Sequence, residues 1–363
     1  MMKVLFPSMP EFSKEIVNTG RQLEMDIARG LAVFFMVLVH VQMSFSKEDI
    51  VESGFGGLID FLGGVPAAPV FMFLMGLGFL YTKNDNPGIF FKRGLYILLA
   101  GYVLNFFRES LPELIDYFTL GTKESLEAAI EGFIDVDILQ FAGLAMIFFA
   151  LYTWMSLKWY MVLYFALIFA SMNYSLQSIQ TEDYLWSAIT GLFWGSSEYS
   201  EFPFLSWIFY PITGYVFAQL LIRCTDKKTF YKWLFLVSLL ATVAGVLFFA
   251  GVLGMGLGME TELAYYHHDF AANLVFLLFV LTWISMLFLL MRILPEFVVN
   301  QFKRWSKNVT EIYFIHWVLI GWLQWYVYPE TYDIVVFVIL SVIIFLVADG
   351  FSHLLAKRQI KLI

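Results

Sequence analysis

Apolar runs long enough to cross a bilayer recur along the whole chain, and they constrain its fold more than any other feature. The chain is 60% hydrophobic and 14% charged, whereas a soluble domain is about 45–50% apolar and 25% charged. Strands of a membrane barrel would instead alternate over about 10 residues. We therefore expect an all-α, polytopic integral membrane bundle of about ten transmembrane helices. The predicted spans are 26–45, 66–82, 90–107, 137–156, 158–176, 203–223, 230–253, 270–293, 309–328 and 333–355.

Positive charge is distributed unevenly among the segments between these spans. Of the 22 Lys and Arg residues, all but Lys47, Arg108 and Lys123 lie in the N-terminal segment, in alternate connecting segments, in the C-terminal tail or in the ends of spans next to these. The positive-inside rule then places both termini in the cytoplasm, with the protein in the cell membrane. We expect a cytoplasmic segment over 1–24 and one transmembrane domain over 25–363. The long outer segment 108–136 predicts two short amphipathic helices lying at the interface.

Two ionisable residues share one face of the first span, 26–45. Arg29 and His40 are eleven residues apart, which at about 100° per residue is three turns plus about 20°. Their separation along the axis is about 16 Å. An ionisable group at mid-membrane is costly unless it faces protein or water, and histidine suits general-base chemistry near neutral pH. We expect Arg29 and His40 to line one cavity.

Two cations open the third span from the same side of the membrane as Arg29. Lys92 and Arg93, together with Arg29, predict a cationic mouth for a phosphorylated ligand. The alternative is that Lys92 and Arg93 serve only as the positive-inside signal.

Several polar residues in later spans, or just before them, are further candidates for ligand contacts. The adjacent histidines 267 and 268 would point apart on a helix, which does not favour a metal site. Acceptor binding and an ordinary loop both remain open for that segment. A single cysteine, Cys224, excludes an internal disulfide and makes a thiolate metal cluster unfavourable. The candidates are Asp137, Gln140, His267, His268, Asn273 and His316.

The first span and four later pieces resemble the transmembrane acyltransferase superfamily, which includes the acyltransferase 3 and heparan-α-glucosaminide N-acetyltransferase families. RQLEMDIARGLAVFFMVLVH has an acidic residue, Arg-Gly, and a histidine eleven residues after the arginine, as in acyltransferase 3 members. FMFLMGLGF with FKRG resembles the second and third spans. IYFIHWVLIGW resembles the late span that contains Tyr and His. DILQFAGLAMI and FPFLSWIFYPITGY resemble spans of the glucosaminide-type branch.

This resemblance implies an enzyme that transfers an acyl group, acetyl above all, from cytoplasmic acyl-CoA to a hydroxyl or amine outside. The acceptor would be a saccharide or amino sugar. Arg29 and His40 would be catalytic, His40 as general base or as a transient acyl carrier. Arg29, Lys92 and Arg93 would hold the coenzyme A phosphates. The residues expected to bind the acceptor are Asp137, Gln140, His267, His268, Asn273 and His316.

The donor substrate, acetyl-CoA or another acyl-CoA, is the only cofactor-like molecule that the resemblance implies, and no metal or nucleic-acid partner is expected. Oligomeric state, including a homo-oligomer, stays open. The alternative function is a proton-coupled secondary transporter of a small solute. Proline-interrupted spans such as 66–82 and 203–223 and buried His and Asp residues suit that class. No two-fold repeat of the span pattern supports it.

Overall fold

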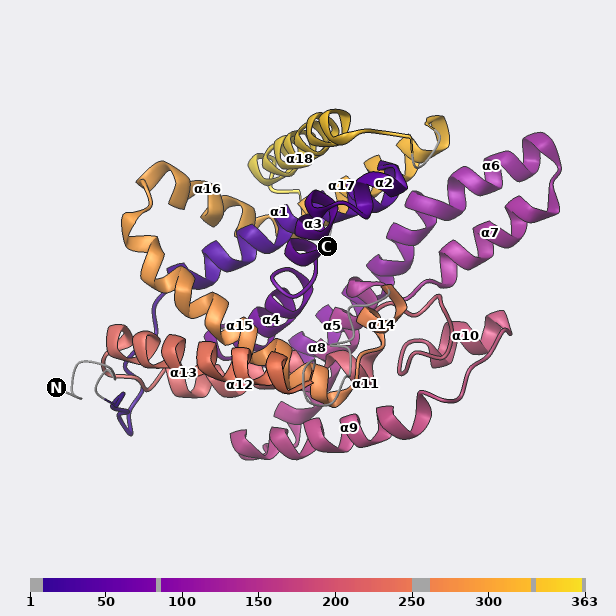
Figure 1. Cartoon of the computed structure of the whole chain (residues 1–363). Helices are drawn as coiled ribbons and strands as arrows, with labels where there is room; N and C mark the ends of the chain where they lie inside the picture. Colours follow the sequence, from indigo (N-terminus) through magenta and orange to yellow (C-terminus); the bar gives the residue numbers. More distant parts are fainter. Residues whose placement is uncertain (1–8, 83–85, 250–261, 328–330, 361–363) are drawn as a thin grey trace.

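The computed structural model describes residues 9–82, 86–249, 262–327 and 331–360, and in this part of the chain it forms helices and no strand (Figure 1). Residues 1–8 of the predicted N-terminal segment and the ends of the predicted spans 230–253 and 309–328 lie outside these ranges. The prediction of an all-α bundle is confirmed. The helices of the first half are α1 Leu23–Phe45, α2 Glu48–Val51, α3 Gly54–Gly63, α4 Ala68–Tyr81, α5 Pro87–Asn105, α6 Leu111–Leu120, α7 Lys123–Ile134 and α8 Ile138–Trp154.

The second half has the same helical character. Its long helices pair with one another and with those of the first half. They are α9 Val162–Leu176, α10 Tyr184–Thr190, α11 Phe204–Trp207, α12 Phe209–Leu221, α13 Lys227–Leu247, α14 Glu262–Tyr266, α15 Phe270–Leu290, α16 Glu296–Lys307, α17 Val309–Tyr326 and α18 Ile334–Lys357.

Eight helices in the described residues are long and apolar enough to cross a membrane. They coincide with eight of the ten predicted spans. The other two predicted spans, 137–156 and 309–328, are occupied by α8, of 17 residues, and α17, of 18 residues. The second predicted span is longer than expected because α3 and α4 continue each other across the turn before Pro69, as one segment of 28 residues.

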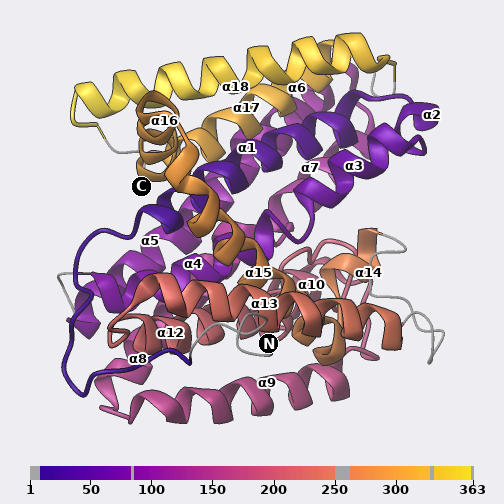
Figure 2. The same ribbon diagram turned by 60° about the vertical axis from the view of Figure 1, so that its left-hand side comes forward.

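Helix α1 runs through the middle of the bundle and contacts α3, α4, α15, α16, α17 and α18. In both views α18 lies along one edge of the molecule and α9 along the opposite edge (Figures 1 and 2). Three further pairs pack side by side: α5 with α8, α4 with α12, and α13 with α15. The ionisable residues of α1 therefore face protein on most sides, which lowers the cost of holding them in an apolar slab.

The outer segment 108–136 is helical as expected, and its first helix is continuous with the preceding span. Helix α6 continues α5 through a π-helical turn, Phe106–Ser110, and the two form one segment of 34 residues. Gly121, with φ of 74°, ends α6 in the left-handed conformation that glycine adopts without strain. Helix α7 then returns alongside α6 (Figure 1). The π turn is what re-aims the side chains of Arg108 and Glu109.

Glycine permits a close helix contact between α4 and α12. A Cβ added at Gly76 would lie 1.9 Å from the carbonyl oxygen of Pro211, whereas one added at Gly78 would meet nothing within 4 Å. We expect Gly76→Ala to destabilise the protein by about 1–3 kcal/mol, because the helices must separate. Gly78→Ala is the control on the same helix. Thermal melting in detergent checks this, and equal melting temperatures for the two variants would contradict it.

Candidate functional site

The imidazole of His40 lies in the interior of the bundle and contacts another histidine. His40 Nδ1 is 2.9 Å from Nε2 of His316 on α17, and the two rings stack 6° from parallel. His316 is 0% exposed, and its Nδ1 is 3.0 Å from the carbonyl oxygen of Ile312. His40 is only partly buried. Its partner is therefore a residue 276 positions away rather than a neighbour on its own helix.

An indole separates these histidines from a buried cation. The ring of Trp317 stacks on His40 at a centroid distance of 4.1 Å. The guanidinium of Arg108 also lies over the ring of Trp317, with its Cζ 4.5 Å from the ring centroid. Trp317 Nε1 donates to the hydroxyl of Tyr313, which in turn donates to Asp137. The rings of α17 therefore connect the histidines to the polar end of α5.

Arg108 is 2% exposed and forms ion pairs with three carboxylates. The nitrogen–oxygen distances are 2.8 Å to Glu109, 2.6 Å to Asp135 and 2.8 Å to Asp137. One cation cannot neutralise three anions. Burial, reinforced by Glu109 and Asp137, raises the pKa of Asp135 in spite of Arg108. The cluster is therefore acidic, and Asp135 is a carboxyl that can retain a proton.

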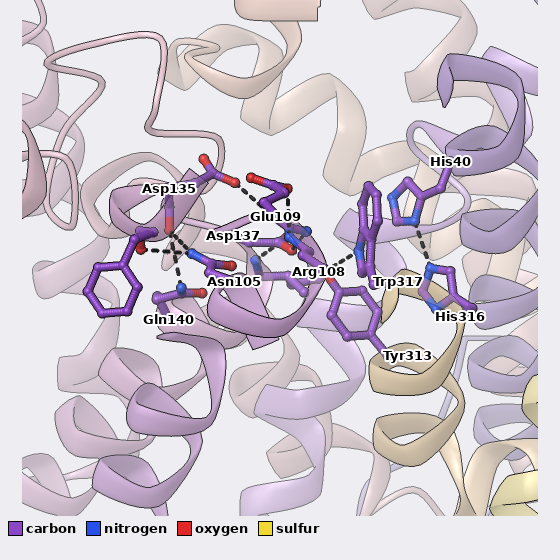
Figure 3. A network of polar contacts seen from close by, with 12 residues as sticks. His40, Asn105, Arg108, Glu109, Asp135, Asp137, Gln140, Tyr313, His316 and Trp317 are labelled. Carbon is purple, nitrogen blue, oxygen red and sulfur yellow. Dashed lines mark hydrogen bonds and ion pairs between the residues drawn. The ribbon is translucent and has the colours of Figure 1, made fainter. Parts of the chain in front are cut away.

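Amide side chains hold this cluster in place from α5 and α8. Asn105 donates to the backbone oxygen of Asp135 at 2.7 Å, and Gln140 donates to the same oxygen at 3.1 Å. Asp137 caps the first turn of α8 by accepting from the N–H of Ile138. Figure 3 shows the resulting network, which runs from Gln140 and Asn105 through Arg108 to Trp317 and the two histidines. We call these residues, with Glu109, Asp135, Asp137 and Tyr313, the central network.

A cavity of about 600 Å³ opens beside Arg108, between the α6–α7 hairpin and α17. Its polar lining is predominantly acidic, with Trp325 and Tyr199 among the aromatic members. The acidic residues that line it are Glu109, Glu113, Asp116, Glu131 and Asp135.

A second cavity, of about 290 Å³, lies at the other end of α5. Arg29 and Arg93 both line it, as the sequence predicts, and the rest of its wall is largely apolar. Lys92, the third predicted cation, is exposed and does not line it. Arg29 donates hydrogen bonds to the hydroxyl of Ser306 and to the carbonyl oxygen of Leu74. The Ser306 hydroxyl in turn donates to Asp26.

The lining of this cavity does not include His40, so the expectation that Arg29 and His40 line one cavity is not met. The cavity does reach the residues just below the central network. Ile138 follows Asp137 in the chain, and Val309 lies one helical turn before Tyr313. Because 15 residues of helix separate Arg93 from Arg108, these two arginines are about 22 Å apart along the helix axis. The central network borders both cavities, since its Arg108 and Asp135 line the acidic one and Ile138, next to its Asp137, lines the other.

Three other predicted residues form a separate polar cluster. His268 is buried and contacts the carbonyl of Tyr265 and the side chain of Asn273. His267 contacts the carbonyl of Ser200, and Ser200 pairs with Val136, which lies between Asp135 and Asp137. Burial lowers the pKa of both histidines. This second cluster therefore supports the backbone pairing of Ser200 with Val136, which lies beside the central network.

None of the six residues expected to bind the acceptor lines the acidic cavity. Asp137, Gln140 and His316 belong to the central network, and their role in binding stays a prediction. Arg108, Asp135 and Trp317 were not among the residues predicted from the sequence. Arg108 did carry a signal, since it is one of only three cations on the predicted outer side. In the described residues, no three His, Cys, Asp or Glu side chains come together as a metal site.

Comparison with known proteins gives one match. The family model of the acyltransferase 3 family, described as an acyltransferase domain, covers residues 22–353 of the chain. No curated protein and no solved structure matches the chain. The match spans every residue of the central network.

Proposed function

This chain belongs to the acyltransferase 3 family, and from that premise we propose that it transfers an acyl group across a membrane, from acyl-CoA to an extracytoplasmic acceptor. The observation that carries the proposal is the position of His40. It contacts His316 and Trp317, which lie on α17 between Thr310, in the wall of the cavity with two arginines, and Gly321, in the wall of the cavity with five carboxylates. The cavity with the arginines is positively charged, as binding of a phosphorylated donor requires. The cavity with the carboxylates is negatively charged, which suits an acceptor without phosphate groups.

The arginine-lined cavity suits the donor. Coenzyme A carries a pyrophosphate and a 3′-phosphate, and guanidinium groups bind phosphate oxygens in pairs. Arg29 and Arg93 would hold these phosphates at the cytoplasmic end, and the apolar wall would accept the pantetheine arm. Arg29 and His40 are about 16 Å apart along α1, so the pantetheine arm has to bridge that distance for the thioester to reach His40.

The acidic cavity suits the acceptor. Carboxylates bind the hydroxyl groups of a saccharide by accepting hydrogen bonds, and they attract the ammonium of an amino sugar. Exposed aromatic rings such as Trp325 add a surface on which a sugar ring can stack. From this cavity a hydroxyl or amine would approach the thioester carbonyl, and His40 would take its proton.

Donor binding tests this assignment directly. We expect Arg29→Ala and Arg93→Ala each to weaken acetyl-CoA binding about tenfold or more, because each removes a charged hydrogen bond worth about 1.5–3 kcal/mol. Lys92→Ala is the matched control, since Lys92 precedes Arg93 but does not line the cavity. Titration of purified protein with labelled acetyl-CoA measures the three affinities. An effect of Lys92→Ala as large as that of Arg93→Ala would place the phosphates elsewhere.

The transporter alternative gives a different result in the same preparation. A transporter reconstituted in vesicles would accumulate its solute in the absence of acyl-CoA. An acyltransferase would release free coenzyme A in step with acceptor labelling.

A further inference from the structure

His316 is fully buried and contacts the group that the proposed function uses as a base. It is 0% exposed, whereas His40 is partly exposed. The chain of contacts runs from the carbonyl of Ile312 to His316 Nδ1 at 3.0 Å, and from His316 Nε2 to His40 Nδ1 at 2.9 Å. Figure 3 shows the contact between the two imidazoles.

The order of these contacts determines where the protons lie. A carbonyl oxygen only accepts, so the nitrogen facing Ile312 must carry a hydrogen. In a neutral imidazole the other nitrogen, Nε2 of His316, then has a lone pair. That lone pair can only accept from His40, so the hydrogen of His40 lies on Nδ1. One arrangement of two neutral rings satisfies every contact, and it leaves Nε2 of His40 unprotonated.

We propose that His316 is a positioning residue, which holds His40 in the tautomer whose Nε2 accepts the acceptor's proton. This inference rests on the proposed function, because it specifies which nitrogen of His40 acts in that reaction. The arrangement follows the logic of a catalytic triad, in which a third group orients the base and stabilises its charged form. Here the third group is a second imidazole, and the carbonyl of Ile312 orients it.

The proton balance of the transfer step uses both rings. As the acceptor oxygen or nitrogen bonds to the thioester carbonyl carbon, its proton passes to His40 Nε2. The hydrogen on Nδ1 can move toward His316 Nε2, which spreads the positive charge over two rings. When the carbon–sulfur bond breaks, the thiolate of coenzyme A leaves with that electron pair and takes the proton back from His40 Nε2. Both histidines then return to their neutral forms.

The ring of Trp317 limits the alternatives. Its stacking on His40, at a centroid distance of 4.1 Å and 26° between planes, keeps the imidazole in its plane without selecting a tautomer. An apolar residue in place of His316 would preserve this stacking and lose the proton acceptor. The packing role and the hydrogen-bonding role of His316 can therefore be separated by substitution.

Three substitutions of the intact, full-length protein test the proposal. His316→Phe keeps an aromatic ring but no nitrogen, and His316→Ala keeps neither. His316→Gln offers an amide oxygen near the position of Nε2, which can accept from His40 Nδ1. We expect the first two to lower kcat for label transfer from acetyl-CoA by at least about 100-fold, with KM for acetyl-CoA within about twofold. His316→Gln should be at least about tenfold faster than His316→Phe.

A packing role alone predicts the reverse order, with His316→Phe as active as His316→Gln or more so, and that result would overturn the proposal. Wild-type kcat in His316→Ala, alongside an inactive His40→Ala, would also overturn it. If His40→Ala itself remains fully active, the proposed function fails first. Retained acetyl-CoA binding by each variant shows that the fold is intact.

Discussion

Replacing His40 with alanine is expected to abolish acyl transfer while leaving the protein folded and inserted. General-base catalysis contributes about 10²–10⁴-fold to a rate, and His40 is the group to which we assign that role. Removing it should lower kcat by at least that factor. The lining of the cavity with the two arginines does not include His40, so acetyl-CoA binding should change little. Transfer of label from acetyl-CoA to envelope saccharide in membrane vesicles measures the effect.

A second histidine provides the control for this experiment. His353 is partly exposed on α18, far along the chain from the central network, and His353→Ala should keep wild-type turnover. Normal turnover in His40→Ala would defeat the enzymatic proposal. Solute accumulation by that variant without acyl-CoA would favour transport instead.

Replacing Arg108 with alanine is expected to be the most destabilising single substitution of a charged residue. The change leaves Asp135 and Asp137, both largely buried, without their cation. Removing one partner of a buried ion pair costs about 3–5 kcal/mol, because the other charge stays desolvated. Transfer activity should fall as well, since the guanidinium also supports the indole that stacks on His40. Thermal melting in detergent measures the stability.

Two comparisons distinguish an unpaired buried charge from simple loss of packing. Lys123, 82% exposed and paired with Glu127, is a cation whose replacement by alanine should change stability by less than about 1 kcal/mol. Adding Asp135→Asn and Asp137→Asn to Arg108→Ala should restore part of the lost stability, because fewer charges remain buried. A further loss in the triple variant would contradict this explanation.

Arg29 and His40 were predictable because both lie on one apolar helix, where spacing alone decides which side chains share a face. The side of the membrane predicted for Arg93 came from charge distribution in the same way. In each case the controlling interaction is local in sequence or set by the bilayer.

The environment of Arg108 could not be predicted in this way. Taken alone, an arginine at the end of an apolar span is expected to anchor at the interface. In the structure Arg108 instead lies in a buried π turn and bonds to Asp135 and Asp137, which come from a different segment.

The sequence by itself therefore determined that this protein is a helical membrane bundle, that an arginine and a histidine lie three turns apart on its first span, and that they resemble an acyltransferase opening. Helix periodicity and hydrophobicity depend on short stretches of sequence, so both can be recognised in a single sequence. Only the tertiary structure decided that His40 meets His316, and that Arg108 closes a network between two cavities. Those contacts join residues far apart in sequence, and helix packing alone brings them within hydrogen-bonding distance.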